Sequence, residues 1–447
     1  MKRFLIFPFV ILPFLFSGHL FAQNTKSDNA ALVYQDAVKS LQGITKDFAV
    51  RSQPVFKNDS SGNYDDFKNL VLQNEQAIEN FKEGSRLEYC DFTFGRKIKN
   101  TITDPVPDYS GAINLARLTI LQAKLFEQDG KNDQALDNYL SVLRLICQLN
   151  RQDNFNLLSN MISVIVQRIV YVPLSGFIQR KDLTADQADL LVKEMISLHK
   201  KYLGLDKAYL EEKEIVRKFM NDFARAVYND RNQNKFSKVF EDNYNALFQS
   251  IISAYSQNSL ESYRKETEKM REQVEREIKE KQKFIFLCAL LGKNTDKIKK
   301  IDIGIGSKND FQDVSDIRDI FNFYGPDLMA KYFVSVGSLE WGQLIPRYYI
   351  DIVNRDLLKT GAAVKSFEIK NRRFPDNLQV LVPDYLEDIP KDPFDDFKPL
   401  KFLKTGSGYS IYSFGPDKID NKAEIVHSGK SEKTEEKGDL VFVLPNR

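Results

Sequence analysis

The sequence predicts a mainly α protein, with a multi-helix body of αα-hairpins or a bundle and a small α+β head at the C-terminus. Apolar residues recur at helical spacing almost throughout residues 27–292, which predicts the body. The stretch GYSIYSFGPDKIDN at 408–421 alternates apolar and polar residues before a Gly-Pro pair, which predicts a strand ending in an acidic turn. The expected segments are a signal peptide at 1–22, a helical body at 23–343, and a head at 344–447 with a polar acidic loop at 421–438.

The N-terminus has the three-part pattern of a secretory signal peptide. Lys2 and Arg3 precede an apolar stretch over 4–16, and small residues lead to Ala22. The stretch is short for a membrane span and contains two prolines, so we favour cleavage after Ala22 over a retained anchor. We expect a periplasmic or secreted protein that is not an integral membrane protein after cleavage, because no later segment looks long and apolar enough to cross a membrane.

Local signals place several helix ends in the body. Asn29 and Thr184 precede apolar-periodic segments as N-caps, and Gly130 is a left-handed stop between two amphipathic segments. That pair matches the small-residue pattern of one tetratricopeptide repeat, but a lone repeat cannot bury its face, so we favour an ordinary αα-hairpin. The apolar helix over 156–174 is expected to be central and to stop near Pro173.

Three further helices are expected. The very polar stretch 259–283 has a short coiled-coil-like seam, and we favour a solvated face there over a partner-binding arm. The other two lie near 311–324 and from about Leu344 to Lys370.

Charge and cysteine content limit the classes of partner. The chain has 64 Lys and Arg against 62 Asp and Glu, and removal of Lys2 and Arg3 leaves 62 of each. A balanced chain has no overall basic field, so we expect no nucleic-acid partner. Three sparse cysteines, Cys90, Cys147 and Cys288, do not form a disulfide framework, although one bridge is permitted outside the cytoplasm. Their apolar neighbours favour buried free thiols.

The sequence lacks the common catalytic motifs. It contains no HExxH, CxxC or G-x-S-x-G, and HSGKS at 427–431 lacks the first glycine of a phosphate loop, so we expect neither zinc nor a nucleotide. His199 lies among lysines near a helix end, which suits the helix dipole better than catalysis. Scattered carboxylates remain, but no local pattern marks a catalytic pair.

Short motifs follow one another in order over residues 363–443. They are Asn371-Arg372-Arg373-Phe374-Pro375, Leu381-Val382-Pro383, Tyr385-Leu386, Asp392-Pro393-Phe394, Tyr412-Ser413, Gly415-Pro416-Asp417 and Gly438-Asp439. This series resembles the globular head of the major pseudopilins of type II secretion systems. No prepilin-type N-terminus precedes it, so we expect a reused module rather than a fibre subunit. The helical body is also similar to that of uncharacterised exported bacterial proteins with the same C-terminal module, which implies architecture and not activity.

The acidic turn after 408–413 is the one predicted metal site. The pseudopilin resemblance implies a calcium loop, with Asp417 and Asp439 at matching motif positions and Asp420 close to them. Hard oxygen ligands in a flexible loop suit Ca²⁺ better than a transition metal. The alternative is an acidic surface turn without an ion, because aspartate favours turns in any case.

Two functions remain open. The first is an exported, non-enzymatic helical binding or scaffold protein, associated through its pseudopilin-like head with secretion or cell-envelope structures and bound to a protein or envelope component. The second is a periplasmic hydrolase of glycan or peptide that uses carboxylates. A concave pocket with two close acids of raised pKa would favour the hydrolase, and an exposed apolar groove would favour the binding protein.

The predicted signal peptide is tested by the N-terminus of the mature protein. Because cleavage is expected after Ala22, mass spectrometry of the exported protein should find a chain beginning at or near Gln23. Recovery of the intact chain from Met1 in membrane fractions would contradict this prediction.

Overall fold

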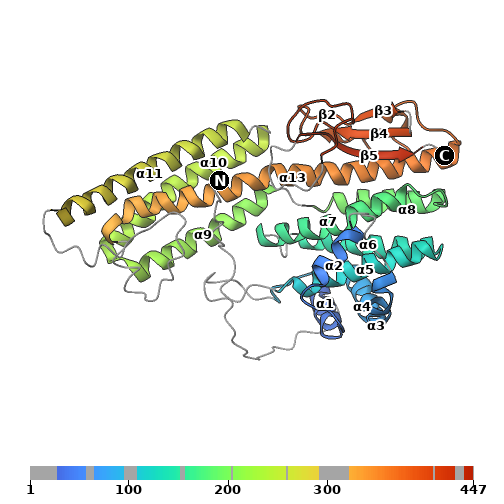
Figure 1. Ribbon diagram of the computed structural model, residues 1–447, viewed down its shortest axis with the longest axis horizontal. Coiled ribbons are helices and arrows are strands. Elements are labelled where there is room, and N and C mark those ends of the chain that lie inside the picture. Colours follow the sequence, from blue (N-terminus) through green and yellow to red (C-terminus); the bar gives the residue numbers. More distant parts are fainter. Residues whose placement is uncertain are drawn as a thin grey trace. The chain divides into compact units, whose positions relative to one another are not determined.

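The structure, a computed structural model, describes residues 28–56, 65–94, 108–151, 157–202, 205–257, 260–290, 322–405, 408–427 and 437–445. It is mainly helical, with a small antiparallel sheet region near the C-terminus, which confirms the coarse fold class (Figure 1). The predicted signal peptide, nearly all of the helix expected near 311–324, and residues 428–436 of the acidic loop lie outside the described residues.

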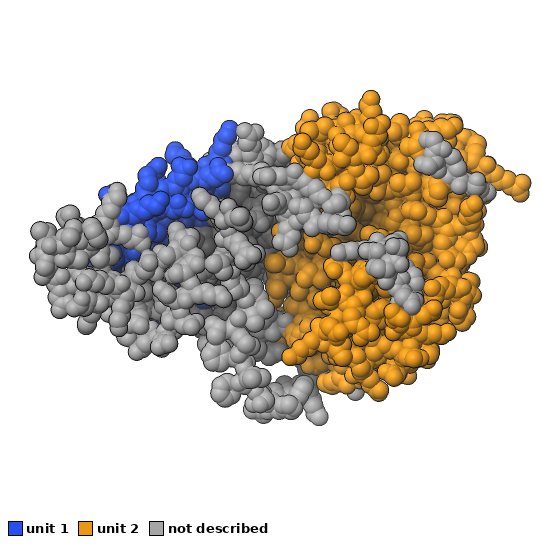
Figure 2. Space-filling view, viewed as in Figure 1, with its two compact units in different colours: residues 1–26, 217–251, 261–340 blue, residues 27–216, 252–260, 341–447 orange. Residues whose placement is uncertain are grey.

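The chain divides into two compact units (Figure 2). The first contains residues 217–251 and 261–340, and the second contains residues 27–216, 252–260 and 341–447. The head residues therefore belong to the same unit as the N-terminal helices.

The first unit is built from long helices. They are the C-terminal end of α9 (Leu205–Val227), most of α10 (Asp230–Gln257), α11 (Leu260–Leu290) and the start of α13 (Pro326–Asn371). Buried aromatic rings follow one another along α10, with centroids 6.1 Å apart for Phe236 and Phe240 and 5.0 Å apart for Phe240 and Tyr244. Such spacing at i and i+4 puts the rings on one helix face, so this face supplies the core of the unit.

The helical part of the second unit is a set of packed hairpins. Its elements are α1 (Ala30–Lys39), α2 (Phe48–Phe56), the 3₁₀ turn η1 (Asp65–Phe67), α3 (Lys68–Gln73), α4 (Glu75–Ser85), α5 (Ser110–Gln128), α6 (Asn132–Leu149), α7 (Leu157–Ile178) and α8 (Ala185–His199). Helices α5 and α6 form the predicted αα-hairpin, and α6 and α7 continue the stack (Figure 1).

The predicted helix ends are confirmed where they are described. The Asn29 side chain accepts a hydrogen bond from the Ala31 amide at 3.0 Å and so caps α1. Thr184 and Gln187 form a reciprocal capping box at the start of α8. Gly130 has φ +70° between α5 and α6, the left-handed conformation expected of a helix stop.

Helix α7 does not stop near Pro173, which corrects the prediction from sequence. It continues to Ile178, because Leu174, Phe177 and Ile178 are fully buried and their packing outweighs the helix bond lost at the proline. The expectation that no later segment is apolar enough to span a membrane also needs correction. Within the described residues, Leu158–Ile178 meets that condition by length and composition, although more than half of its best window is buried inside the protein.

The head is built on the C-terminal half of α13, which begins at Pro326, earlier than the predicted start at Leu344. The 3₁₀ turn η2 (Leu378–Leu381) follows, and then the short strands β1 (Lys391–Asp392) and β2 (Lys398–Pro399) pair with each other. Strands β3 (Lys401–Thr405), β4 (Gly408–Ser413) and β5 (Leu440–Pro445) form an antiparallel sheet in the order β3-β4-β5. Strand β4 ends at Ser413, as the sequence predicts.

The sheet and α8 pack on different sides of α13 (Figure 1). Gly361 of α13 faces the ring of Phe442 on β5, and a Cβ atom at position 361 would overlap three atoms of that ring. Toward α8, Ser366 donates a hydrogen bond to Asp189, and Lys370 pairs with the same carboxylate at 2.5 Å. The absence of a side chain at Gly361 therefore sets how closely the sheet approaches the helix.

Gly361→Ala tests this close approach. We expect the added methyl group to displace Phe442 and to lower the free energy of unfolding of the second unit by about 1–3 kcal/mol, the usual penalty for overpacking. Urea unfolding can be followed by the fluorescence of Trp341, the single tryptophan, whose position belongs to this unit.

The control is a double-mutant cycle with Phe442→Leu. If the two side chains compete for the same space, Gly361→Ala should be less damaging in the Phe442→Leu background. Equal penalties in both backgrounds would show that the contact does not limit packing.

Candidate functional site

The structure places the three predicted calcium ligands around one turn of the head. Asp417 and Asp420 follow β4, and Asp439 precedes β5 with no exposed surface. Their carboxylates accept hydrogen bonds from the backbone. Asp439 accepts from the Asn421 amide at 3.2 Å and the Ala423 amide at 2.7 Å. Asp417 accepts from the Gly438 amide at 3.0 Å, and Asp420 accepts from the Lys422 amide at 2.9 Å.

The three carboxylates interact electrostatically. Burial raises the pKa of Asp439, and the charges of Asp420 and Asp417 raise it further against the two backbone hydrogen bonds. In the described part of the chain, however, no three acidic, histidine or cysteine side chains converge as a metal-binding group. The turn thus has the negative charge that a cation needs, while its carboxylate oxygens are engaged by amides.

A fourth aspartate, Asp392, fixes the start of the same turn. Its buried carboxylate accepts hydrogen bonds from the Ser413 hydroxyl at 2.7 Å and from the amides of Phe394 and Phe414, both at 2.9 Å. Burial raises the pKa of Asp392, and these three donors oppose the rise. The aspartate of the Asp-Pro-Phe motif therefore ties β1 to the end of β4, a structural task.

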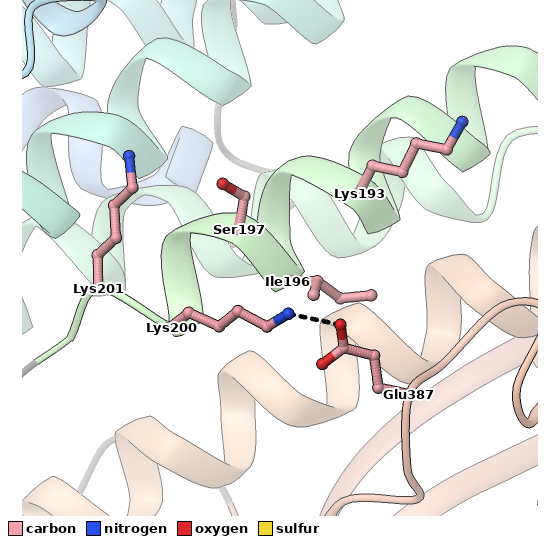
Figure 3. A pocket seen from close by; sticks show the side chains of 6 residues that line it. All are labelled: Lys193, Ile196, Ser197, Lys200, Lys201 and Glu387. Carbon is pink, nitrogen blue, oxygen red and sulfur yellow. Dashed lines mark hydrogen bonds and ion pairs between the residues drawn. The ribbon is translucent and has the colours of Figure 1, made fainter.

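A second candidate site is an open pocket of about 450 Å³ between α8 and the head (Figure 3). It is lined by Lys193, Ile196, Ser197, Lys200, Lys201 and Glu387. Figure 3 shows Lys193 and Lys201 at opposite sides, with Ile196 and the ion pair of Lys200 with Glu387 between them. That ion pair has an N–O distance of 2.5 Å. Pockets of this volume are in the range that accommodates small ligands or a few side chains of a partner.

We call this pocket with its ion-pair neighbours the lysine pocket. Lys201 pairs with Glu88 at 2.9 Å, and Glu88 also pairs with Arg151 at 2.8 Å. Both cations lower the pKa of Glu88. The lining itself has three lysines against one carboxylate, that of Glu387. The lysine pocket therefore carries an excess of positive charge.

The acids that line the two cavities bear on the alternative of a carboxylate-dependent hydrolase. Such an enzyme needs two acids in one cleft. The residues that line the lysine pocket include Glu387 as their single acid, in an ion pair, and those that line a second, much smaller cavity include Asp351 as their single acid. Neither of these two cavities has the predicted pair.

The remaining residues singled out from sequence have structural roles. Cys90 and Cys147 are buried free thiols, as expected, and burial raises the pKa of the Cys147 thiol to about 11. The side chain of Cys288 lies outside the described residues. His199 stands in the last turn of α8, but burial and the charges of Lys359 and Arg355 lower its pKa to about 4. The imidazole is therefore neutral near pH 7, and the predicted interaction of a charged His199 with the helix dipole is not made.

Comparison with protein-family models, with curated proteins and with solved structures gives no match. The pseudopilin resemblance of the head therefore stays a prediction carried by its motifs.

Sequence reasoning missed the lysine pocket, because Lys200 and Glu387 are 187 residues apart and only the fold joins them. It also missed Asp351 and Arg355, which lie in a buried part of α13. A signal for these two was present: a charged pair at i and i+4 inside the apolar run YYIDIVNRDLL at 348–358 is unusual for a buried helix.

Proposed function

We propose that the protein is an exported, non-enzymatic binding or scaffold protein, with a helical body and a C-terminal pseudopilin-like head, in the periplasm or outside the cell. The observation that carries this proposal is the lysine pocket, a concave, positively charged surface formed by α8 and the head. Lysine ammonium groups held in one concave surface suit the recognition of negative charge.

The partner that this surface fits is an acidic segment of another protein. Lys193 reaches the pocket from an exposed position on α8, and its ammonium group forms no ion pair within the described part of the chain. The Lys200–Glu387 and Lys201–Glu88 pairs hold two further ammonium groups in place. An acidic segment would gain three cationic contacts, and Ile196 offers an apolar surface between them.

Binding of poly-L-glutamate tests this function. The wild type should bind the polymer at low salt, and the affinity should fall with added salt because the contacts are exposed ion pairs. Lys193→Glu should weaken binding about tenfold, on the order of 1.4 kcal/mol for one reversed charge, whereas Lys193→Arg should retain it. Isothermal titration calorimetry measures both.

Lys181→Glu is the matched control, since Lys181 is an exposed lysine of the same unit that precedes α8. It makes the same change of net charge outside the pocket and should leave the affinity within twofold of the wild type. Equal losses for Lys181→Glu and Lys193→Glu, or stronger binding to anionic lipid vesicles than to the acidic polymer, would contradict an acidic protein partner at this pocket.

We further propose that the acidic turn binds Ca²⁺ through Asp417, Asp420 and Asp439. The coupling of their charges supports this. Burial raises the pKa of Asp439 most, and the charges of Asp420 and Asp417 add to the rise, so a divalent cation would relieve that repulsion. Carboxylate oxygens that accept an amide hydrogen bond still have a lone pair for a cation, and backbone carbonyls of the turn would complete the ligand set.

Calcium should raise the melting temperature of chelator-treated protein, because a ligand that binds only the folded state stabilises it. At a concentration 100-fold above its Kd the stabilisation is about 2.7 kcal/mol. Asp417→Ala should abolish the rise, whereas Asp388→Ala, an exposed aspartate elsewhere in the head, should preserve it. Absence of a calcium-dependent rise in the wild type would leave the turn without an ion.

A further inference from the structure

A small internal cavity lies where α13 packs against α7 in the second unit. Asp351 and Arg355 of α13 line it, with Tyr348 on the same helix. The remaining lining residues are Asn150, Asn160, Val164, Gln167 and Tyr202. The cavity has a volume of about 10 Å³, which is the room that one water molecule needs, and seven of its eight lining residues carry a polar group that a water could contact.

Two charged side chains line this cavity, and each has one polar atom that lacks a hydrogen-bond partner among the described residues. Asp351 is 6% exposed and Arg355 is 8% exposed. The Oδ2 atom of Asp351 and the Nη1 atom of Arg355 are buried and have no hydrogen-bond partner among the residues that the structure describes. A buried donor or acceptor without a partner is destabilising by about as much as a lost hydrogen bond, so each atom requires one.

The neighbouring polar groups already have partners. Asn160 donates to Asn150 at 3.0 Å, and the Tyr171 hydroxyl donates to Gln167 at 2.8 Å. The guanidinium of Arg355 lies over the ring of Tyr202, 4.2 Å from its centroid. What remains is one unpartnered donor and one unpartnered acceptor beside a space of water size.

We propose that the cavity holds one water molecule that accepts a hydrogen bond from Arg355 and bridges it to Asp351, and that this contact makes the second unit sensitive to pH near neutrality. The water accepts from Nη1 of Arg355 and donates to Oδ2 of the ionised Asp351. When Asp351 is protonated, its hydroxyl donates to the same water instead. This inference does not depend on the proposed binding function.

The titratable and charged groups near Asp351 lie on each of the segments packed against it. They are Arg168 and Tyr171 on α7, Tyr202 after α8, and Arg347, Tyr348, Arg355 and Asp356 on α13. His199 of α8 and Lys359 of α13 lie beside Arg355 and Asp356. Burial raises the pKa of Asp351 to about 7, against the opposing effect of Arg168, Arg355 and Arg347.

The direction of the pH effect follows from this rise. An aspartate titrates near pH 3.9 in an unfolded chain, whereas Asp351 titrates near 7 in the folded protein. Between these values the folded state binds the additional proton, so the stabilisation is complete below about pH 4 and is lost as the pH rises through 7. One proton changes the unfolding equilibrium constant about tenfold per pH unit in this window.

Asp351→Asn tests the assignment to this carboxyl group. Urea unfolding, followed by Trp341 fluorescence, gives the unfolding equilibrium constants of wild type and variant. The ratio of wild type to Asp351→Asn should rise about 50-fold between pH 5 and pH 7. Glu368→Gln is the matched control, because Glu368 is a buried carboxylate of the same helix that pairs with Lys365 at 2.9 Å. A constant ratio for Asp351→Asn, or the same rise for Glu368→Gln, would overturn the proposal.

Val164→Ile tests the water. An added methyl group that enters a dry void would improve packing and raise the melting temperature, whereas one that displaces a bridging water leaves Arg355 and Asp351 without their partner and lowers it. We expect a lower melting temperature at pH 6 and at pH 8. An unchanged or higher value at either pH would overturn the water bridge.

Discussion

The burial of α13 around its whole circumference is the constraint on which the second unit depends. From Asp351 to Phe367 nearly every residue of this helix is buried, although the segment contains several charged residues. A helix that is buried all round must be covered on every side. The sheet covers it at Gly361, α8 covers it at Ser366 and Lys370, and α7 faces it near Asp351. The head is therefore folded onto this helix and is not a freely attached domain.

Because this part of α13 is buried, several of its charged side chains form ion pairs with one another. Asp356 pairs with Lys359 at 2.7 Å, and Lys365 pairs with Glu368 at 2.9 Å, each one turn along the same helix. Buried charges need partners of this kind because a charge that leaves water loses its hydration free energy, and only a close, hydrogen-bonded opposite charge offsets that loss. Among the described residues no hydrogen-bond partner meets the Oδ2 atom of Asp351, and burial raises the pKa of this carboxyl to about 7 against the opposing charges of nearby arginines.

The sequence was sufficient where structure depends on neighbours along the chain. The caps at Asn29 and Thr184, the stop at Gly130 and the end of β4 at Ser413 each follow from the chemistry of a few adjacent residues. The sequence was insufficient where packing between distant segments determines the structure. Helix α7 passes Pro173 because of its burial, and the lysine pocket joins residues 187 positions apart, so no local pattern contains either fact.

The aspartates of the acidic turn have a structural role in the turn in addition to the proposed binding of a cation. Gly415 and Gly438 approach each other so closely that a Cβ at Gly415 would overlap the Gly438 carbonyl, and Lys422 and Ala423 have positive φ. Backbone in these conformations directs its amides toward the inside of the turn, where they need acceptors. Asp417 and Asp439 accept hydrogen bonds from four backbone N–H groups of this region, those of Ile419, Gly438, Asn421 and Ala423. The aspartates are thus required by the shape of the turn itself, and a bound cation would add to a role that they already have.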